Sequence, residues 1–189
     1  GNYQTEQQAK EQLARFVSTY SNAAEWKQRA QRIRAGILRG AELAPLPQKC
    51  PLNPILHSQR EHDGYSVENL AFESLPGVFV TGNLYRPTKG KGPFAGVLCP
   101  HGHWADGNGH PEVQKRCLNL ARLGYVTFST TQNHYEDPAL GVSHQTLMIW
   151  NNIRGLDYLE SLPEVDRTRI GVAGASGGGL QTQMLTAVD

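Results

Sequence analysis

Apolar residues recur at helical spacing through the N-terminal part of the chain. We predict two helices between Thr5 and Gly40, with a break and a cap at Ser21-Asn22. The apolar positions are Leu13, Phe16, Val17, Tyr20 and Ala24, followed by Trp26, Ala30, Ile33 and Ile37. We expect this apolar stripe to pack on the main body of the protein, with an oligomer contact as the alternative. Residues 1–44 are therefore interpreted as an N-terminal helical segment that carries no catalytic chemistry.

A proline-rich stretch follows, and strand-like segments come after it. Proline disfavours helix at its own position and at the preceding residue, so residues 45–64 are predicted to form an extended connector. The prolines are Pro45, Pro47, Pro51 and Pro54. Beyond them, Tyr65–Ser74 and Val78–Tyr85 are predicted to be strands joined by a turn at Pro76-Gly77. Alternating positions in the second strand predict that only one of its faces is buried.

From Phe94 onward, predicted strands alternate with predicted helices. The strands are Phe94–Cys99, Tyr125–Ser129 and Arg169–Ala173, and the helices are Glu112–Leu123, Gln145–Leu162 and Leu180–Val188. This order predicts an α/β fold in which antiparallel first strands lead into a mainly parallel sheet with flanking helices. Ligands of such sheets bind beyond the carboxyl ends of the strands. We therefore expect the chemistry between the loop after Cys99 and the loop after Ala173.

One short motif lies where the last of these strands meets the last helix. Gly174-Ala175-Ser176-Gly177-Gly178 fits the pattern G-x-S-x-G, and its strand–turn–helix context is that of a nucleophile elbow. Ser176 is the candidate nucleophile. Gly174 and Gly178 are the elbow glycines, because a side chain at either position would collide with the approaching strand and helix. The alternative is a glycine-rich turn with an incidental serine.

A serine nucleophile needs two further groups to attack a carbonyl carbon. An imidazole must remove its proton, and backbone N–H groups must stabilise the oxyanion of the tetrahedral intermediate. One N–H is expected from Gly177, the residue after the serine, and the other from the loop His101-Gly102-His103-Trp104. The His-Gly pair follows an apolar strand and precedes the elbow in the sequence. The two motifs together indicate a serine-hydrolase site more specifically than either motif does alone.

The chain resembles the α/β-hydrolase superfamily, in particular its acetyl xylan esterase and dienelactone-hydrolase-like branch. The resemblance is carried by residues 75–87, 94–103, 148–159 and 165–178. It implies a serine-dependent carboxylic-ester hydrolase that acts through an acyl-enzyme on acetylated or otherwise esterified carbohydrate. It also implies that the backbone N–H groups of His103 and Gly177 form the oxyanion hole and that His101 is a structural residue beside it. A secreted or periplasmic location and the absence of a cofactor are further implications.

The chain departs from this superfamily after the serine. The superfamily places the catalytic acid and histidine on later strands, whereas only thirteen residues and no histidine follow Ser176. Asp189 comes too early for the acid, and Asp157 and Asp166 are interpreted as a helix-surface charge and a turn residue. We expect residues 65–189 to be the N-terminal half of a hydrolase domain, incomplete at its C-terminal side and inactive alone. A missing C-terminal half or a second chain would then complete the site.

Three other functions are alternatives to the esterase. A metal-dependent hydrolase could use His101, His103, Asp106 and His110, but their spacing does not match H-x-H-x-D-H, so no metal is expected. The glycines Gly171, Gly174 and Gly177 do not give a nucleotide-binding fingerprint. A non-catalytic binding protein or pseudo-enzyme remains the main alternative, because the triad is incomplete. Asp106 and His110 are interpreted as loop-capping or substrate-facing residues.

Composition limits the classes of binding partner and says little about the catalytic site. Eighteen Lys and Arg residues against seventeen Asp and Glu give a formal net charge of +1, without a basic stripe that would favour nucleic acid or an anionic membrane. No apolar run is long enough to span a bilayer. The spacing of Cys50, Cys99 and Cys117 fits neither a disulfide framework nor a metal pair. Trp104, His134 and Tyr135 are loop residues that face either substrate or packing partners.

Overall fold

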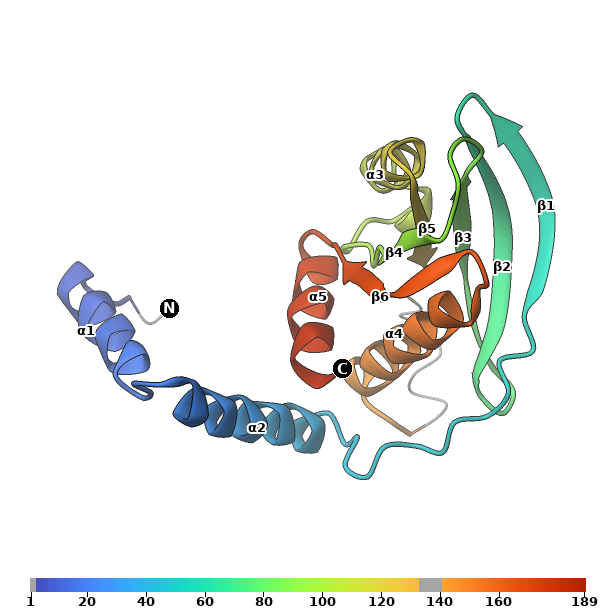
Figure 1. Cartoon of the computed structure of the whole chain (residues 1–189). Helices are drawn as coiled ribbons and strands as arrows, with labels where there is room; N and C mark the ends of the chain where they lie inside the picture. The colour runs from blue at the N-terminus through green and yellow to red at the C-terminus, as the bar shows by residue number, and fades with distance from the viewer. Residues whose placement is uncertain (1–2, 133–140) are drawn as a thin grey trace.

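The strands of the computed structural model form a six-stranded sheet in the order β1-β2-β3-β5-β4-β6 (Figure 1). The structure describes residues 3–132 and 141–189. The strands are β1 Ile55–His62, β2 Tyr65–Leu75, β3 Val78–Pro87, β4 Phe94–Leu98, β5 Tyr125–Thr130 and β6 Val165–Val172. β1, β2, β3 and β5 pair antiparallel in that order, whereas β4 lies parallel to both β5 and β6. The predicted change from antiparallel to parallel pairing is confirmed.

Helices cover both faces of the parallel half of the sheet. α3, Pro111–Arg122, packs on β5 and β3, while α4, His144–Ser161, packs on β4 and β6. α5, Gly177–Val188, follows β6 and lies beside α4 (Figure 1). A short 3₁₀ helix, Gly107–Gly109, precedes α3. Among the described residues, no helix combines the length and the hydrophobicity needed to cross a bilayer.

The core has two parts, and neighbouring residues of one strand contribute to opposite parts. The larger cluster, on the α4 face, contains Leu70, Phe72, Val80, Leu84, Leu98, Val126, Phe128, Ile149, Trp150 and Ile153 among others. The smaller cluster, on the α3 face, contains Tyr65, Val67, Tyr85, Cys99, Val113, Cys117 and Ala121. Leu84 and Tyr85 thus point to opposite faces, as do Leu98 and Cys99, because side chains alternate along a strand. The prediction that β3 is buried on one face only is wrong at Tyr85, which α3 and its neighbours cover.

Some element boundaries differ from the sequence prediction. Strand β1 lies inside the segment that was expected to be a connector, and its eight residues are all exposed. A strand exposed on both faces carries no apolar alternation, so its pattern could not reveal it. β6 begins at Val165 rather than at Arg169, and α5 begins at Gly177 rather than at Leu180.

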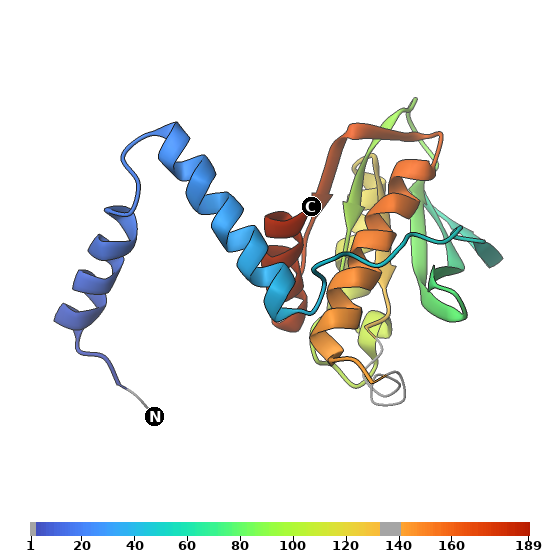
Figure 2. The same cartoon turned by 90° about the horizontal axis from the view of Figure 1, so that it is seen from below.

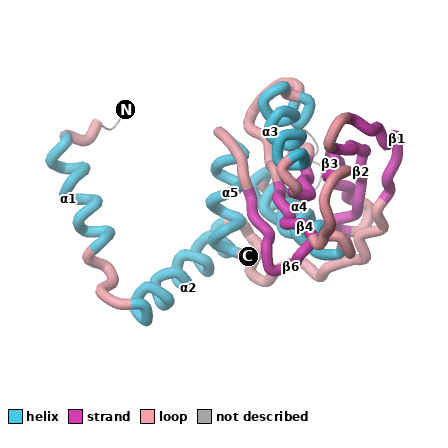
Figure 3. Tube along the Cα trace, turned by 45° about the horizontal axis from the view of Figure 1, so that its top comes forward, coloured by secondary structure: helices cyan, strands magenta, loops and turns pink. Residues whose placement is uncertain are grey.

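The N-terminal helices extend away from the sheet. α1, Glu6–Val17, and α2, Ala23–Gly40, have N-cap side chains from Thr5 and Asn22, but neither contains a buried residue. Only the last turns of α2 reach the main cluster, and α2 contacts α5. Figures 2 and 3 show α1 on the far side of α2 from the sheet. The expectation that the whole apolar stripe packs on the main body is therefore wrong, since its first-helix residues are exposed.

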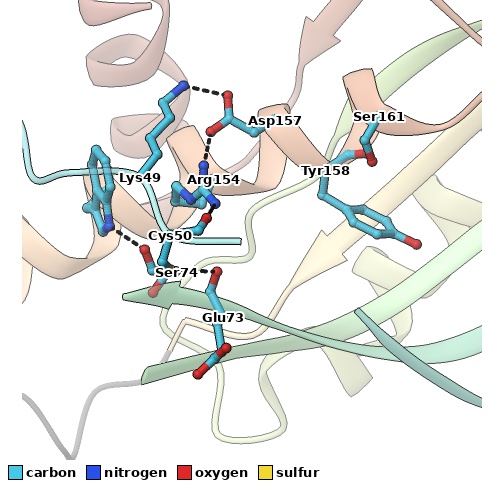
Figure 4. A network of polar contacts seen from close by, with 9 residues as sticks. Lys49, Cys50, Glu73, Ser74, Arg154, Asp157, Tyr158 and Ser161 are labelled. Atoms are coloured by element: carbon cyan, nitrogen blue, oxygen red, sulfur yellow. Dashed lines mark hydrogen bonds and ion pairs between the residues drawn. The ribbon is translucent and has the colours of Figure 1, made fainter. Parts of the chain in front are cut away.

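An ion-pair network fastens the connector to α4 (Figure 4). Arg154 is buried, and its guanidinium donates to the carboxylate of Asp157 at 2.6 Å and to the backbone carbonyl of Cys50. Lys49 of the connector pairs with the other oxygen of Asp157 at 2.7 Å. Asp157 is thus the shared anion of two cations, as expected for a residue with a structural rather than a catalytic role.

Asp157→Asn should destabilise the fold, because it leaves the buried guanidinium of Arg154 without its counter-charge. We expect the free energy of unfolding to fall by about 2 kcal/mol, somewhat less than for a fully buried pair, since Asp157 keeps some exposure. Urea unfolding followed by circular dichroism measures the change. Glu160→Gln, on an exposed position of the same helix, is the control and should leave the midpoint unchanged. Equal midpoints for the two variants would contradict a stabilising role of the pair.

Candidate active site

Ser176 lies at the sharp turn between β6 and α5. Its backbone has φ 56° and ψ −122°, a conformation in the left-handed half of the map that a residue with a side chain adopts only under strain. The residue is exposed, and within the described chain its side chain makes no capping hydrogen bond to α5. The predicted strand–turn–helix context of the motif is confirmed. The turn presents the Ser176 hydroxyl to solvent immediately before the N-terminus of a helix.

The elbow and the loop after β4 are in backbone contact. A Cβ atom on Gly178 would collide with the carbonyl of Pro100, and one on Gly174 would collide with the backbone of Gly178. A Cβ on Gly102 would lie 2.9 Å from the carbonyl oxygen of Ala175. β4 and β6 are parallel neighbours, so the loops that follow them leave the same edge of the sheet. The expectation that these two loops meet is confirmed, and it explains the glycines on both sides.

The buried side chain of His101 holds the loop after β4 in place through two hydrogen bonds. Its Nε2 accepts a hydrogen bond from the backbone N–H of Gln132 at 2.9 Å, so the ring proton sits on Nδ1, which donates to the carbonyl of Gly102 at 2.6 Å. The side chain is buried, and burial lowers the pKa of His101 below its ordinary value. His101 is therefore a neutral structural residue that joins the loop to the end of β5.

His103 and Gly177 lie against each other across the two loops. A Cβ placed on Gly177 would be 2.7 Å from Cε1 and 2.8 Å from Nδ1 of the His103 ring. Gly177 is the first residue of α5, where N–H groups have no carbonyl one turn earlier inside the helix. The positive end of the helix dipole favours a negative charge at this point. The two residues assigned to an oxyanion hole from the sequence thus come from the loop after β4 and from the first turn of α5, and they are adjacent in space.

The aspartates considered for the catalytic acid lie far from Ser176. Asp189 ends α5, and the twelve-residue helix separates it from the elbow by about 18 Å. Asp166 lies at the opposite end of β6, where it accepts hydrogen bonds from Thr168 and Arg169 that lower its pKa to about 2. Asp157 is engaged in its ion pairs on α4. Asp166 lies at a turn, as interpreted from the sequence, whereas Asp157 is a largely buried ion-pair partner rather than a helix-surface charge.

Two of the three histidines considered for a metal site, His101 and His110, make other contacts in this structure. Both ring nitrogens of His101 are engaged by backbone groups. His110 precedes α3, where its Nδ1 accepts from the N–H of Glu112 at 3.3 Å, and its ring stacks on Trp104 with centroids 4.4 Å apart. Within residues 3–132 and 141–189, no three His, Cys, Asp or Glu side chains are arranged to hold a metal ion. His110 is a capping residue, whereas the Asp106 side chain makes no capping bond to the 3₁₀ helix that it precedes.

Trp104 is one of three residues considered for contact with substrate, and in the structure it packs against His110. His134 and Tyr135, the other two, lie outside the described residues.

A small cavity beside the elbow contains residues that the sequence analysis did not single out. Its volume is about 140 Å³, and it is lined by His101, Gly102, His103, Gln132, His144, Gln145, Met148, Gly177, Leu180 and Gln181. Four of these residues, Gln145, Met148, Leu180 and Gln181, lie in segments that were predicted to be helical and were given no functional role. Gln181 stands on a face of α5 with Met184, Leu185 and Val188, and this polar residue in an apolar pattern is a sequence signal that could have identified it.

Comparison with solved structures places this architecture among known enzymes. A methylesterase, BT1017, superposes with a TM-score of 0.84 at 32% identity, covering 98% of this chain and 44% of that chain. A protein from Bacteroides fragilis, provisionally assigned as an acetyl xylan esterase, gives 0.75 at 16% identity, covering all of this chain and 59% of that one. Acetyl xylan esterase 1 from Thermoanaerobacterium gives 0.62 at 16% identity, covering 82% and 54%. No protein-family model matches the sequence.

The sheet order and the flanking helices, together with the similarity to these solved structures, define an α/β-hydrolase fold. The chain belongs to the α/β-hydrolase superfamily, and the solved structures that it resembles include esterases of the acetyl xylan, methyl and dienelactone-hydrolase-like kinds. It spans less than two thirds of the length of each of the three compared proteins.

Gly178→Ala should disrupt the contact between the two loops, because the added methyl group meets backbone rather than a movable side chain. We expect the free energy of unfolding to fall by about 2 kcal/mol, measured by urea unfolding. Gly171→Ala in β6 is the matched control, since a Cβ there has no neighbour within 4 Å. Equal stability of the two variants would contradict the close backbone contact between Gly178 and Pro100.

His101 should make the fold sensitive to acid. The folded protein holds this imidazole neutral, whereas the unfolded chain protonates it with a pKa of about 6.5. Its contribution to stability is therefore fully present above this pH and is lost as the pH falls toward the lower pKa of the folded state. We expect the free energy of unfolding, measured from pH 7.5 to pH 5, to decline less steeply in His101→Gln than in the wild type. His57→Gln, at an exposed position, should keep the wild-type slope, and an unchanged slope in His101→Gln would refute the assignment.

Proposed function

We propose that the protein is a serine-dependent carboxylic-ester hydrolase and that Ser176 is its nucleophile. The observation that carries this proposal is the strained, exposed position of Ser176 at a helix N-terminus, in contact with the loop that holds His101 and His103. Strained backbone persists where the surrounding structure enforces it, and such positions cluster at active sites. The glycine contacts around Ser176 supply that enforcement.

The proposed reaction proceeds through an acyl-enzyme. Ser176 Oγ attacks the ester carbonyl carbon while a general base takes its proton, and the backbone N–H groups of His103 and Gly177 bind the oxyanion that forms. The bond between the carbonyl carbon and the alkoxy oxygen then breaks, and the alcohol leaves with the proton. Water, activated by the same base, attacks the acyl-enzyme and releases the carboxylic acid and the free serine.

The base and its acidic partner are proposed to come from outside residues 1–189, either from further chain or from a second chain. Two features of the sheet edge support this. β6 is the last strand in the sheet order, so among the described residues no strand pairs with its outer side. Beside it lies a hollow of about 450 Å³ lined by α4, β6 and α5 residues, among them Leu156, Ile170, Val172 and Leu185. An open strand edge is a surface that proteins usually cover.

The proposed substrate is an acetylated or otherwise esterified carbohydrate. The names of two of the similar structures, both acetyl xylan esterases, support this class. A location in the periplasm or outside the cell is part of the same proposal. It follows from the resemblance to esterases of carbohydrate polymers, which are substrates outside the cytoplasm.

Ser176→Ala should abolish ester hydrolysis. In the longer polypeptide that contains these residues, we expect the rate of 4-nitrophenyl acetate hydrolysis to fall by about 10³-fold or more, because no other group replaces the nucleophile. A fluorophosphonate probe should label wild type at Ser176 and leave Ser176→Ala unlabelled, as peptide mass spectrometry measures. Residues 1–189 alone should show little turnover.

Three outcomes would count against this mechanism. Turnover that survives Ser176→Ala, or a label on another residue, would remove Ser176 from its role. Robust turnover by residues 1–189 would mean that the general base lies within them. Absence of turnover and of labelling in the longer polypeptide would instead favour a non-catalytic binding protein.

A further inference from the structure

A cavity of about 370 Å³ lies on the α3 face of the sheet, between α3 and the strands β1, β2 and β3. Small-molecule sites in proteins have volumes of about 300–1,000 Å³, so this cavity has the size of such a site. Its polar lining residues are Arg60, His62, Tyr65, Asn83, Tyr85 and Gln114. It shares no described lining residue with the cavity beside Ser176, so the two cavities are separate.

Side chains on one face of three neighbouring strands form the floor of this cavity. Arg60 pairs with Val67 across β1 and β2, and Val67 pairs with Tyr85 across β2 and β3. His62, two residues beyond Arg60 on β1, pairs with Tyr65. Because every second side chain of a strand points to the same face, these five residues stand together on the α3 face of the sheet.

Hydrogen bonds between side chains hold one wall of the cavity in shape. Asn83 donates to Asn69 at 3.0 Å and accepts from Asn108 at 2.7 Å. Arg60 donates to the same Asn69 oxygen at 3.3 Å through one guanidinium nitrogen. The Asn83 amide is thus engaged at both polar atoms, whereas no described side chain binds the remaining guanidinium nitrogens of Arg60. Those nitrogens are available to a ligand.

Two largely buried tyrosines present unpaired hydroxyls to the cavity. Tyr65 is 9% exposed and Tyr85 is 5% exposed, and neither hydroxyl has a hydrogen-bond partner in the described part of the chain. Neither hydroxyl oxygen is fully enclosed by protein, so both are open to the cavity that their residues line. Burial raises the pKa of Tyr85, so its hydroxyl stays protonated and can donate. The O–H group of a buried tyrosine usually has a partner, and a ligand in the cavity would supply one.

The charge of the lining selects the kind of ligand. Arg60 supplies a guanidinium, and His62 adds an imidazole that stacks on the Tyr65 ring with centroids 4.8 Å apart. No described lining residue is Asp or Glu. Glu61, between the two basic residues, lies on the other face of β1, because side chains alternate along a strand. A carboxylate or a phosphate complements this wall, since a guanidinium binds either group through two parallel hydrogen bonds.

The rest of the lining fits a body that carries hydroxyl groups. Gln114 and Leu118, one turn apart on α3, face the sheet across the cavity. Tyrosine hydroxyls and the Gln114 amide both donate and accept hydrogen bonds, as the hydroxyls of a sugar do. Val67 and Leu118 add apolar surface for the C–H groups of a sugar ring.

We propose that this cavity binds an anionic sugar, one that carries a carboxylate or a phosphate group. Arg60 pairs with the acidic group. The hydroxyls of Tyr65 and Tyr85 and the amide of Gln114 hydrogen-bond the sugar hydroxyls. The cavity is separate from the turn at Ser176, so this binding goes beyond ester hydrolysis and does not depend on it.

Isothermal titration calorimetry of the longer polypeptide tests the proposal with glucuronate, glucose 6-phosphate and glucose, which share one hexose ring. We expect an anionic sugar to bind and glucose to bind at least about tenfold more weakly, because glucose lacks the group that pairs with Arg60. The tighter of the two anionic sugars identifies the acidic group as a carboxylate or a phosphate. Glucose that binds as tightly as both anionic sugars would contradict the proposal.

Two variants locate the bound sugar. Arg60→Gln should raise the Kd of the preferred anionic sugar about tenfold, and Tyr85→Phe should raise it about fivefold. Tyr85→Phe removes a hydroxyl that has no protein partner, so the thermal unfolding midpoint should stay at the wild-type value. Arg34→Gln on α2 and Tyr125→Phe on β5 are the matched controls, at exposed positions outside the cavity, and should leave the Kd unchanged.

Two further results would overturn the proposal. Absence of binding by both anionic sugars would mean that water alone pairs the tyrosine hydroxyls. An unchanged Kd in both Arg60→Gln and Tyr85→Phe would mean that the sugar binds elsewhere on the protein. Absence of ester hydrolysis by wild type would overturn the proposed function and leave this site intact.

Discussion

The site depends on a backbone contact between two loops that leave neighbouring parallel strands. The turn after β6 approaches the loop after β4 so closely that Gly178 meets the carbonyl of Pro100, and Gly102 meets that of Ala175. No side chain fits between them, so the glycines are a steric requirement. This contact sets where Ser176 stands and brings His103 against Gly177. The small cavity exists because α4 and α5 continue from the same edge of the sheet.

Two features of the site cost free energy in the folded protein. Ser176 adopts a backbone conformation that favours glycine, and Gln145 buries a donor without a partner. Ser176 lies at the turn between β6 and α5, and Gln145 lines the small cavity beside that turn. Proteins retain such departures from local preference mainly where function uses them, and stabilise them by surrounding structure. Here the bond from Gln132 to His101 and the buried network through Asn152 provide that support.

The two halves of the sheet differ in strand pairing and in how helices cover them. Near β1 it is antiparallel and curves away from the helices, whereas β4, at the centre of the parallel half, is covered by helices on both faces (Figure 1). The connector is joined to α4 by the charges of Lys49, Arg154 and Asp157, so the chain before the sheet is fixed to the helix that lines the cavity. At the other side, the edge of β6 is open. The proposed site therefore sits between a well-covered strand and an uncovered edge.

The sequence by itself determined the parallel half of the fold and the immediate surroundings of Ser176. Continuous apolar runs, their alternation with helical periods and the glycines around Ser176 are local signals, and parallel strands bring their carboxyl ends to one edge by geometry. It did not reveal β1, whose residues are exposed on both faces and carry no alternation. Nor did it determine the partner of the N-terminal stripe, because periodicity predicts a helix and not what covers it. Gln145, Leu180 and Gln181 converge only once the rotation and lateral position of α4 and α5 are set, and packing against the sheet decides both.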